Sequence, residues 1–313
     1  CRDREVSDRD QWFPLYWGWW FTSPDNRTKR RRAQVIMSDL AASRSAEIRL
    51  QAFHCAWASN FHIANYNLCL KAIDDGLKLY DQDVARVSRT KYGDHDARVC
   101  GCAERALALW LQGLGKAADE SIDEALTWAH SIDHLGSQTH ALDVAMTLRS
   151  YEQRVEDVLM FADRARVIAD SNSLPVLVAK SRIFSGWAMA VSGSFERGFS
   201  EFEGGLATQR SIGSDEDLPF YLDMLSQMYE KRGELEKAHK TLDEAVREAR
   251  VAGNLFWLPE LMRRRGIIGL RVGGDPALSR ADLIQAIALA EHQGAHALAD
   301  TAGESLQEIE GDK

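Results

Sequence analysis

The stretch from Leu222 to Ala249 decides the fold, and it reads LDMLSQMYEKRGELEKAHKTLDEAVREA. Its apolar residues recur every three or four positions on both sides of Gly233, which is the spacing of two amphipathic helices. Gly233 falls where the first helix should end, because glycine adopts the left-handed conformation of a tight turn without a steric penalty. The stretch is therefore predicted to form two antiparallel helices joined by a short turn.

The same pattern recurs along the chain with a period of forty residues. The turn column consists of Gly113, Gln153, Gly193, Gly233 and Gly273. Three columns after the turn hold Ala118, Val158, Gly198 and Ala238, then Ile122, Ala162, Phe202 and Leu242, then Ala125, Ala165, Gly205 and Ala245. A column before the turn holds the mostly small residues Ala106, Met146, Gly186, Ser226 and Gly266. Small residues let two helices approach closely, so the columns predict a stack of packed helix pairs.

The unit resembles the tetratricopeptide repeat. The residues that carry the resemblance are Leu225, Tyr229, Gly233, Ala238, Leu242 and Ala245. The period of forty exceeds the usual thirty-four, so extra residues should lengthen helices or loops, as in segments 131–139 and 211–218. HEAT repeats share the longer period, but the turn glycine and the alanine five residues later recur together, which favours the tetratricopeptide type. Pro219 and Pro259, also forty apart, are predicted to lie in the first turn of a helix.

The predicted fold is all-α, a right-handed superhelical solenoid of about seven antiparallel helix pairs. Residues 96–313 carry the regular tetratricopeptide-like repeats, and residues 1–95 are predicted to form irregular helical repeats with an aromatic cap, all in one continuous solenoid. Helical periodicity runs through 48–60 and 65–80, and the polar stretch 81–95 is predicted to be the longest loop. The basic run 27–32 is predicted to open an amphipathic helix that ends at Leu40.

Composition favours a folded, helix-rich protein in the cytoplasm. The 313 residues are 45% hydrophobic and 27% charged, with only six prolines. A net charge of −9 argues against nucleic acid or an anionic membrane as the main partner. The five cysteines, Cys1, Cys55, Cys69, Cys100 and Cys102, are an odd number and are interpreted as reduced thiols. A chain that starts at Cys1 is expected to be a piece of a longer protein or a processed one.

No motif in the sequence predicts catalysis, a cofactor or a metal. Gly115 and Lys116 do not form a phosphate loop, since that pattern needs a glycine at Trp110 and a hydroxyl at Ala117. His292 and His296 lie four apart on a predicted helix, but the sequence offers no third ligand for a metal. Cys100 and Cys102 are two apart, so on a helix they point in different directions and could not chelate a metal together. His130, His134 and His140 flank a helix end without a partner acid. The carboxylates, such as those from Glu234 to Glu248, follow solvent-facing helix strips.

Two features near the N-terminus have functional alternatives. The basic run Arg27 to Arg32 beside aromatic residues could contact an acidic partner, but the exposed face of a capping helix is the favoured interpretation. The aromatic residues Trp12, Trp17, Trp19, Trp20 and Phe21 could form a small-molecule sensor site. Aromatics at helical spacing belong more often to a core or a buried domain joint.

Several stretches resemble the C-terminal region of bacterial multidomain regulators. They are WFPLYWG at 12–18, AERALALW at 103–110, GWAMA at 186–190, GLATQR at 205–210 and MRRRG at 262–266. In that family a class III adenylate or guanylate cyclase domain, or a DNA-binding domain, precedes an ATPase module and a tetratricopeptide tail. The resemblance implies a signalling role in which the tail senses or interacts while catalysis resides elsewhere.

The predicted function is therefore that of a non-catalytic regulatory module. It would bind a protein or peptide segment, or a neighbouring domain of the same protein, on the concave face formed by the first helices of the pairs. The residues predicted to line that face are Lys180, Ile183, Trp187, Phe220, Asp223, Gln227, Glu230 and Arg263. The alternatives are the regulatory tail of a nucleotide cyclase and a small-molecule sensor.

Overall fold

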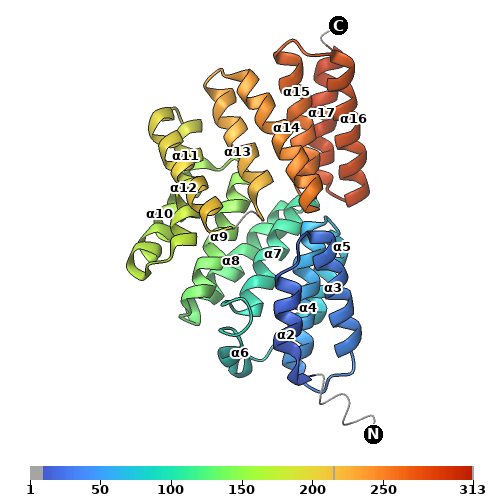
Figure 1. Cartoon of the computed structure of the whole chain (residues 1–313), viewed down its shortest axis with the longest axis vertical. Helices are drawn as coiled ribbons and strands as arrows, with labels where there is room; N and C mark the ends of the chain where they lie inside the picture. Colours follow the sequence, from blue (N-terminus) through green and yellow to red (C-terminus); the bar gives the residue numbers. More distant parts are fainter. Residues whose placement is uncertain (1–9, 214–215, 312–313) are drawn as a thin grey trace. The chain divides into compact units, whose positions relative to one another are not determined.

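The computed structural model describes residues 10–213 and 216–311, and all regular secondary structure in these ranges is helical (Figure 1). The helices are α2 (Phe13–Phe21), α3 (Asn26–Leu40), α4 (Ala46–His62), α5 (Tyr66–Leu77), α6 (Gln82–Ser88), α7 (Ala97–Leu111), α8 (Gly115–Ser131), α9 (Leu135–Tyr151), α10 (Val155–Asn172), α11 (Pro175–Val191), α12 (Phe195–Ser211), α13 (Leu218–Lys231), α14 (Leu235–Ala252), α15 (Leu258–Arg271), α16 (Pro276–Gln293) and α17 (His296–Gly311). The all-α prediction is confirmed, and consecutive helices pack against one another from α2 to α5 and from α10 to α17, as in a solenoid.

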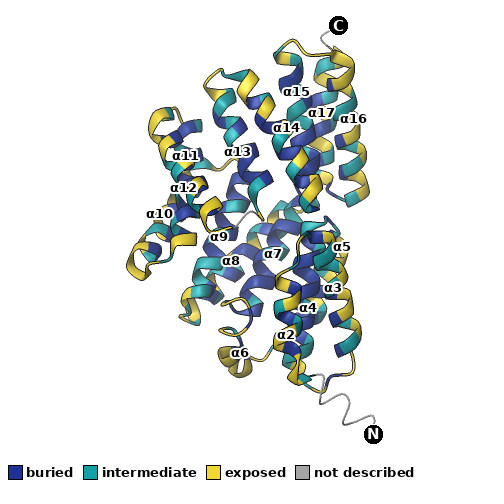
Figure 2. Cartoon of the chain, viewed as in Figure 1, coloured by how far each residue is buried: buried dark blue, intermediate teal, exposed yellow. Residues whose placement is uncertain are grey.

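The chain divides into two compact units, each of which is described by itself. Unit 1 contains residues 1–110 and 114–144, and unit 2 contains residues 111–113 and 145–313. The change of register predicted at residue 95 is a different division and lies inside unit 1. Within each unit the helices bury one face against their neighbours and expose the other (Figure 2).

The turn prediction is confirmed, and the structure refines it. All five residues of the turn column have positive φ, including Gln153 at 56°. The left-handed residues recur every twenty positions from the loop before α7 onward, namely Gly93, Gly113, Asp133, Gln153, Ser173, Gly193, Gly213, Gly233, Gly253 and Gly273. Both turns of each forty-residue repeat therefore use the same backbone geometry, the one within a helix pair and the one between pairs.

The predicted helix-packing columns are buried. Ala118, Val158, Gly198 and Ala238 lie at the interface between paired helices, as do the two columns that follow them. Helices α11 and α12 approach closely, since a side chain added at Gly198 would meet the backbone nitrogen of Ala190 at 2.6 Å. Pro219 and Pro259 lie in the first turns of α13 and α15, as predicted.

The expectation that residues 81–95 form one long loop was wrong, and of the two expected ways to lengthen the repeat at segment 131–139, the structure shows longer helices. The polar stretch 81–95 is not all loop, because it contains α6, whose first turn is capped by the Asp81 carboxylate accepting from the backbone N–H groups of Asp83 and Val84. Segment 131–139 is a tight turn that enters α9 at Leu135, so the longer period comes from helices of 14 to 18 residues. Part of segment 211–218 lies outside the described residues.

The predicted N-terminal helices are present. The basic run opens α3, and the two periodic segments correspond to α4 and α5. Cys55, Cys69, Cys100 and Cys102 are buried free thiols, as interpreted from the sequence, whereas Cys1 lies outside the described residues. None of the helices in the described ranges is long and apolar enough to span a membrane.

Candidate functional site

The residues predicted to line a binding face come from three consecutive first helices of unit 2. Lys180, Ile183 and Trp187 belong to α11, the four residues from Phe220 to Glu230 belong to α13, and Arg263 belongs to α15. Of the eight, Ile183, Trp187, Phe220 and Asp223 are buried, between 0% and 4% exposed. These four therefore contact other parts of unit 2 rather than offering a surface to a partner.

Trp187, Gln227 and Asp223 form one hydrogen-bonded chain across α11 and α13. The indole N–H of Trp187 donates to Gln227 Oε1 at 3.0 Å, and Gln227 Nε2 donates to Asp223 Oδ2 at 3.2 Å. The indole of Trp257, just before α15, donates to the same Asp223 oxygen at 2.9 Å. Because a buried carboxylate needs several donors, this chain accounts for the charge of Asp223 in the core.

Arg264 supplies the positive charge of this network. Its Nε lies 2.7 Å from Asp223 Oδ1, and its Nη2 lies 3.1 Å from Glu230 Oε2 and donates to Ser226 Oγ at 2.9 Å. Sequence reasoning chose Arg263 and missed Arg264. One helical position rotates a side chain by about 100°, and within the run 263–265 the periodicity alone did not settle which arginine faces α13.

Arg263 and Lys180 are partly exposed, and each forms an ion pair with a carboxylate of unit 2. Arg263 makes a bidentate contact with Glu260, with both distances 2.7 Å, and also donates to Ser305 Oγ at 2.9 Å. Burial lowers the pKa of the Arg263 guanidinium, but the Glu260 carboxylate outweighs burial and raises it overall. Lys180 donates to Asp217 at 3.1 Å. The charged residues of the predicted face thus already form ion pairs within the protein. Binding of a partner by these residues stays a prediction.

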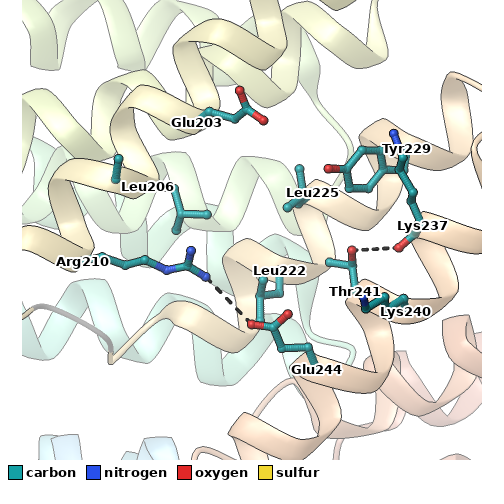
Figure 3. A pocket seen from close by; sticks show the side chains of 11 residues that line it. Glu203, Leu206, Arg210, Leu222, Leu225, Tyr229, Lys237, Lys240, Thr241 and Glu244 are labelled. Carbon is teal, nitrogen blue, oxygen red and sulfur yellow. Dashed lines mark hydrogen bonds and ion pairs between the residues drawn. The ribbon is translucent and has the colours of Figure 1, made fainter.

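A groove lies elsewhere in unit 2, between α12, α13 and α14, with a cavity volume of about 470 Å³ (Figure 3). Its apolar lining consists of Leu206, Ala207, Leu222, Leu225 and Tyr229, and its charged and polar lining consists of Glu203, Arg210, Lys237, Lys240, Thr241 and Glu244. Two of the three helices are second members of their pairs, so the groove is not the first-helix face predicted from the sequence.

Charges of both signs line this groove. Arg210 on α12 lies 3.9 Å from Glu244 on α14, and Figure 3 shows this pair extending between the two helices. Lys237 is 2.5 Å from Glu234, and its ammonium group lies 5.5 Å from the ring centre of Tyr229.

Glu203 and Lys240 are the charged groove residues that are available to a partner. Neither takes part in an ion pair within the described ranges, and both are exposed. The groove therefore offers one free carboxylate and one free ammonium group beside an apolar floor.

The aromatic residues near the N-terminus divide between core and surface of unit 1. Trp17 and Trp20 are buried, and the Trp20 indole donates to Ser59 Oγ at 2.7 Å. Trp12 and Trp19 are 59% and 41% exposed. With Leu15, Tyr16, Val35 and Asp39, they line a mainly apolar depression of about 420 Å³. The core interpretation thus holds for two of the tryptophans.

The basic run packs against these aromatics. The Arg32 guanidinium lies 4.8 Å from the ring centre of Trp19, and the Lys29 ammonium group lies 4.9 Å from that of Trp20. Cation–π contacts of this kind favour a basic residue beside an indole within one protein. The run is therefore part of the packing between α2 and α3.

The prediction that His292 and His296 lie on one helix is wrong. His292 lies in the last turn of α16 and His296 begins α17, with the left-handed Gly294 between them. His140 stacks on His95 with ring centres 4.3 Å apart. The group of His, Cys, Asp and Glu side chains in the described residues that has metal-binding spacing is His54, His95 and Cys100.

Comparisons with known proteins identify a longer relative. No protein-family model matches the chain. An uncharacterized protein of Rhizobium meliloti (strain 1021) is 37% identical over 309 residues, which is 99% of this chain and 30% of the relative. The chain thus spans less than a third of the length of that relative.

Among solved structures, BtubC (BKLC) from P. vanneervenii is similar, with a TM-score of 0.45 and 16% sequence identity. The match covers 73% of this chain and 89% of the other.

Proposed function

We propose that unit 2 is a protein-interaction module that binds an extended protein segment in the groove between α12, α13 and α14. The observation that carries the proposal is the combination of an apolar floor with uncommitted charges of opposite sign at Glu203 and Lys240. A small apolar side chain of the segment would contact Leu225 and Tyr229. An acidic residue beside it would pair with Lys240, and a basic one with Glu203.

Paired helices suit this role because they hold the groove walls without a ligand. α13 packs on α14 by the buried column Ala238, Leu242 and Ala245, so Lys240 and Thr241 project from a fixed backbone. A pre-formed site loses less conformational entropy on binding. The proposal assigns no catalysis to this chain.

The test is a peptide selection against the full chain, followed by affinity measurements with charge-reversed variants. Selected peptides should bind about tenfold more weakly to Lys240→Glu, since a like-charge contact replaces an attractive one. Peptides with their acidic residue changed to lysine should recover affinity for that variant. Lys116→Glu is the matched control, because Lys116 is 93% exposed on α8 in unit 1. If the selected peptides bind the Lys240→Glu and Glu203→Lys variants as tightly as they bind the parent chain, the groove is not the binding site.

A second candidate rests on the length of the relative. The chain matches 30% of the Rhizobium meliloti protein, so we propose that the repeats regulate other domains of a longer protein. The family resemblance suggests a nucleotide cyclase or a DNA-binding domain for that role. The coding sequence beside this region decides between them, and the absence of both domains there would remove this candidate.

A further inference from the structure

Two histidine rings in unit 1 meet through their Nε2 atoms. His54 projects from α4, and His95 lies just before α7. Their Nε2 atoms are 3.3 Å apart. His54 is buried and His95 is half-buried, so the contact is sheltered from solvent on one side.

The other nitrogen of each ring fixes where its proton lies. His95 Nδ1 is 2.7 Å from the backbone oxygen of Gly93, and His54 Nδ1 is 3.1 Å from Gln51 Oε1. The Gln51 amide is oriented by its Nε2 group, which donates to Glu47 Oε1 at 2.8 Å. Since both oxygens can only accept, each Nδ1 must carry the proton. Each Nε2 then presents a lone pair to the other ring.

Two lone pairs at this distance repel unless a cation lies between them. With the proton of each ring on Nδ1, neither Nε2 donates to the other. The pair of rings is thus an acceptor site without a donor among the described residues.

Cys100 places a sulfur beside the two rings. It lies on α7, is buried, and its Sγ and one nitrogen from each histidine all lie within 4.8 Å of one another. Trp57, fully buried on α4, has an indole Nε1 without a hydrogen-bond partner among the described residues.

We propose that His54, His95 and Cys100 bind one zinc ion. Tetrahedral zinc with Zn–N bonds of about 2.0–2.1 Å holds two imidazole nitrogens about 3.3–3.4 Å apart, and the measured separation of the two Nε2 atoms is 3.3 Å. Imidazole nitrogen and thiolate sulfur are the donors that zinc prefers. Three protein ligands leave one coordination position for water or a further ligand.

The surroundings hold the ligands as outer-shell partners of a metal site do. Histidine ligands ordinarily donate their second N–H to a carbonyl or carboxylate, as both rings do here. The His54 ring stacks on Trp57 with centres 4.7 Å apart, and the His95 ring stacks on His140. The rings are thus positioned by packing before any metal is bound, which favours binding.

The experiment uses the full chain after treatment with a chelator and dialysis. Zinc content after titration is measured by mass spectrometry, and cobalt(II) replaces zinc as a spectroscopic probe. We expect one equivalent of zinc per chain and a thiolate-to-cobalt charge-transfer band. Folded protein that takes up no zinc, or a cobalt complex without this band, would overturn the site.

Two variants and one control separate the site from adventitious binding. His95→Ala and Cys100→Ser should each bind zinc about a hundredfold more weakly or worse, since loss of a ligand exceeds loss of an outer-shell partner. Cys102→Ser is the control, because Cys102 is equally buried two residues further on α7 and outside the cluster. His95 is half-buried, so its variant keeps the test valid if Cys100→Ser fails to fold. Unchanged uptake by His95→Ala would refute the proposal.

Discussion

In unit 2 the buried carboxylate of Asp223 receives two donors and faces the Arg264 guanidinium, whereas in unit 1 the rings of His54 and His95 present acceptors to each other. Both clusters join helices that are far apart in sequence. The first is complete within the chain, and its role is to hold α11, α13 and α15 together. The second lacks a donor, and a cation supplies what it lacks. In a structural network each buried acceptor has a donor within the protein. In a ligand site some buried acceptors lack one, and the ligand takes that place.

The largest expected effect is the loss of stability when the hydrogen-bonded network around Asp223 in unit 2 is broken. Asp223→Ala should lower the free energy of unfolding by about 3–5 kcal/mol, because it leaves Arg264 in a buried position with less compensation. Urea unfolding followed by tryptophan fluorescence measures the loss, since Trp257 donates to Asp223 directly.

Asp243→Ala is the matched control for that change. Asp243 is 52% exposed and lies 3.5 Å from Arg265, so its removal should cost less than about 1 kcal/mol. Equal losses for the two variants would mean that the buried network contributes nothing beyond a surface pair.

The second-largest expected effect is the stabilisation of unit 1 by bound zinc. Zinc at about a hundred times its dissociation constant should stabilise unit 1 by about 2.7 kcal/mol, because it binds only the folded state. Hydrogen exchange should slow in α4 and α7, which carry the ligands, and stay unchanged in α13 to α15. Protection spread equally over both units would contradict a site confined to unit 1.

The sequence could predict the helix pairs of this protein but not its polar clusters. Turn glycines and small packing residues recur at fixed intervals because each repeat packs against the same kind of neighbour. The roles of Gly233 and Ala238 could therefore be predicted from the sequence. His54, His95 and Cys100 follow no interval, since they come from α4, a loop and α7. Their proximity depends on tertiary packing and on the left-handed residues Gly93 and Asp94.

The burial of four predicted binding residues could not be read from the sequence for a related reason. Residues such as Trp187 and Phe220 lie on the predicted first helices, yet those helices pack against each other through these large side chains. A periodic pattern identifies a helix face but does not tell whether a neighbour already covers it. The groove residues Glu203 and Lys240 belong to second helices, where sequence reasoning saw only charged solvent-facing strips.

A smaller effect tests the close packing of α11 and α12 in unit 2. Gly205→Ala should destabilise the protein by about 1–3 kcal/mol, because the new methyl group would lie 2.6 Å from the backbone oxygen of Ala179. At the adjacent Gly204, a methyl group meets only the end of the Arg182 side chain, which can move. Gly204→Ala should therefore be neutral or stabilising, and thermal unfolding compares the two. Similar melting temperatures for both variants would show that the helices can separate at no cost.

The smallest expected effect concerns the one turn-column residue that is not glycine. Gln153 has φ of 56°, and a side chain in this region costs about 1 kcal/mol relative to glycine. Gln153→Gly should stabilise unit 2 by somewhat less than this, since the side chain also donates to the Ser150 backbone oxygen at 3.0 Å. The reverse change, Gly193→Ala at φ of 99°, should destabilise it. Chemical denaturation measures both signs, and a loss of stability in Gln153→Gly would mean that this hydrogen bond outweighs the backbone strain.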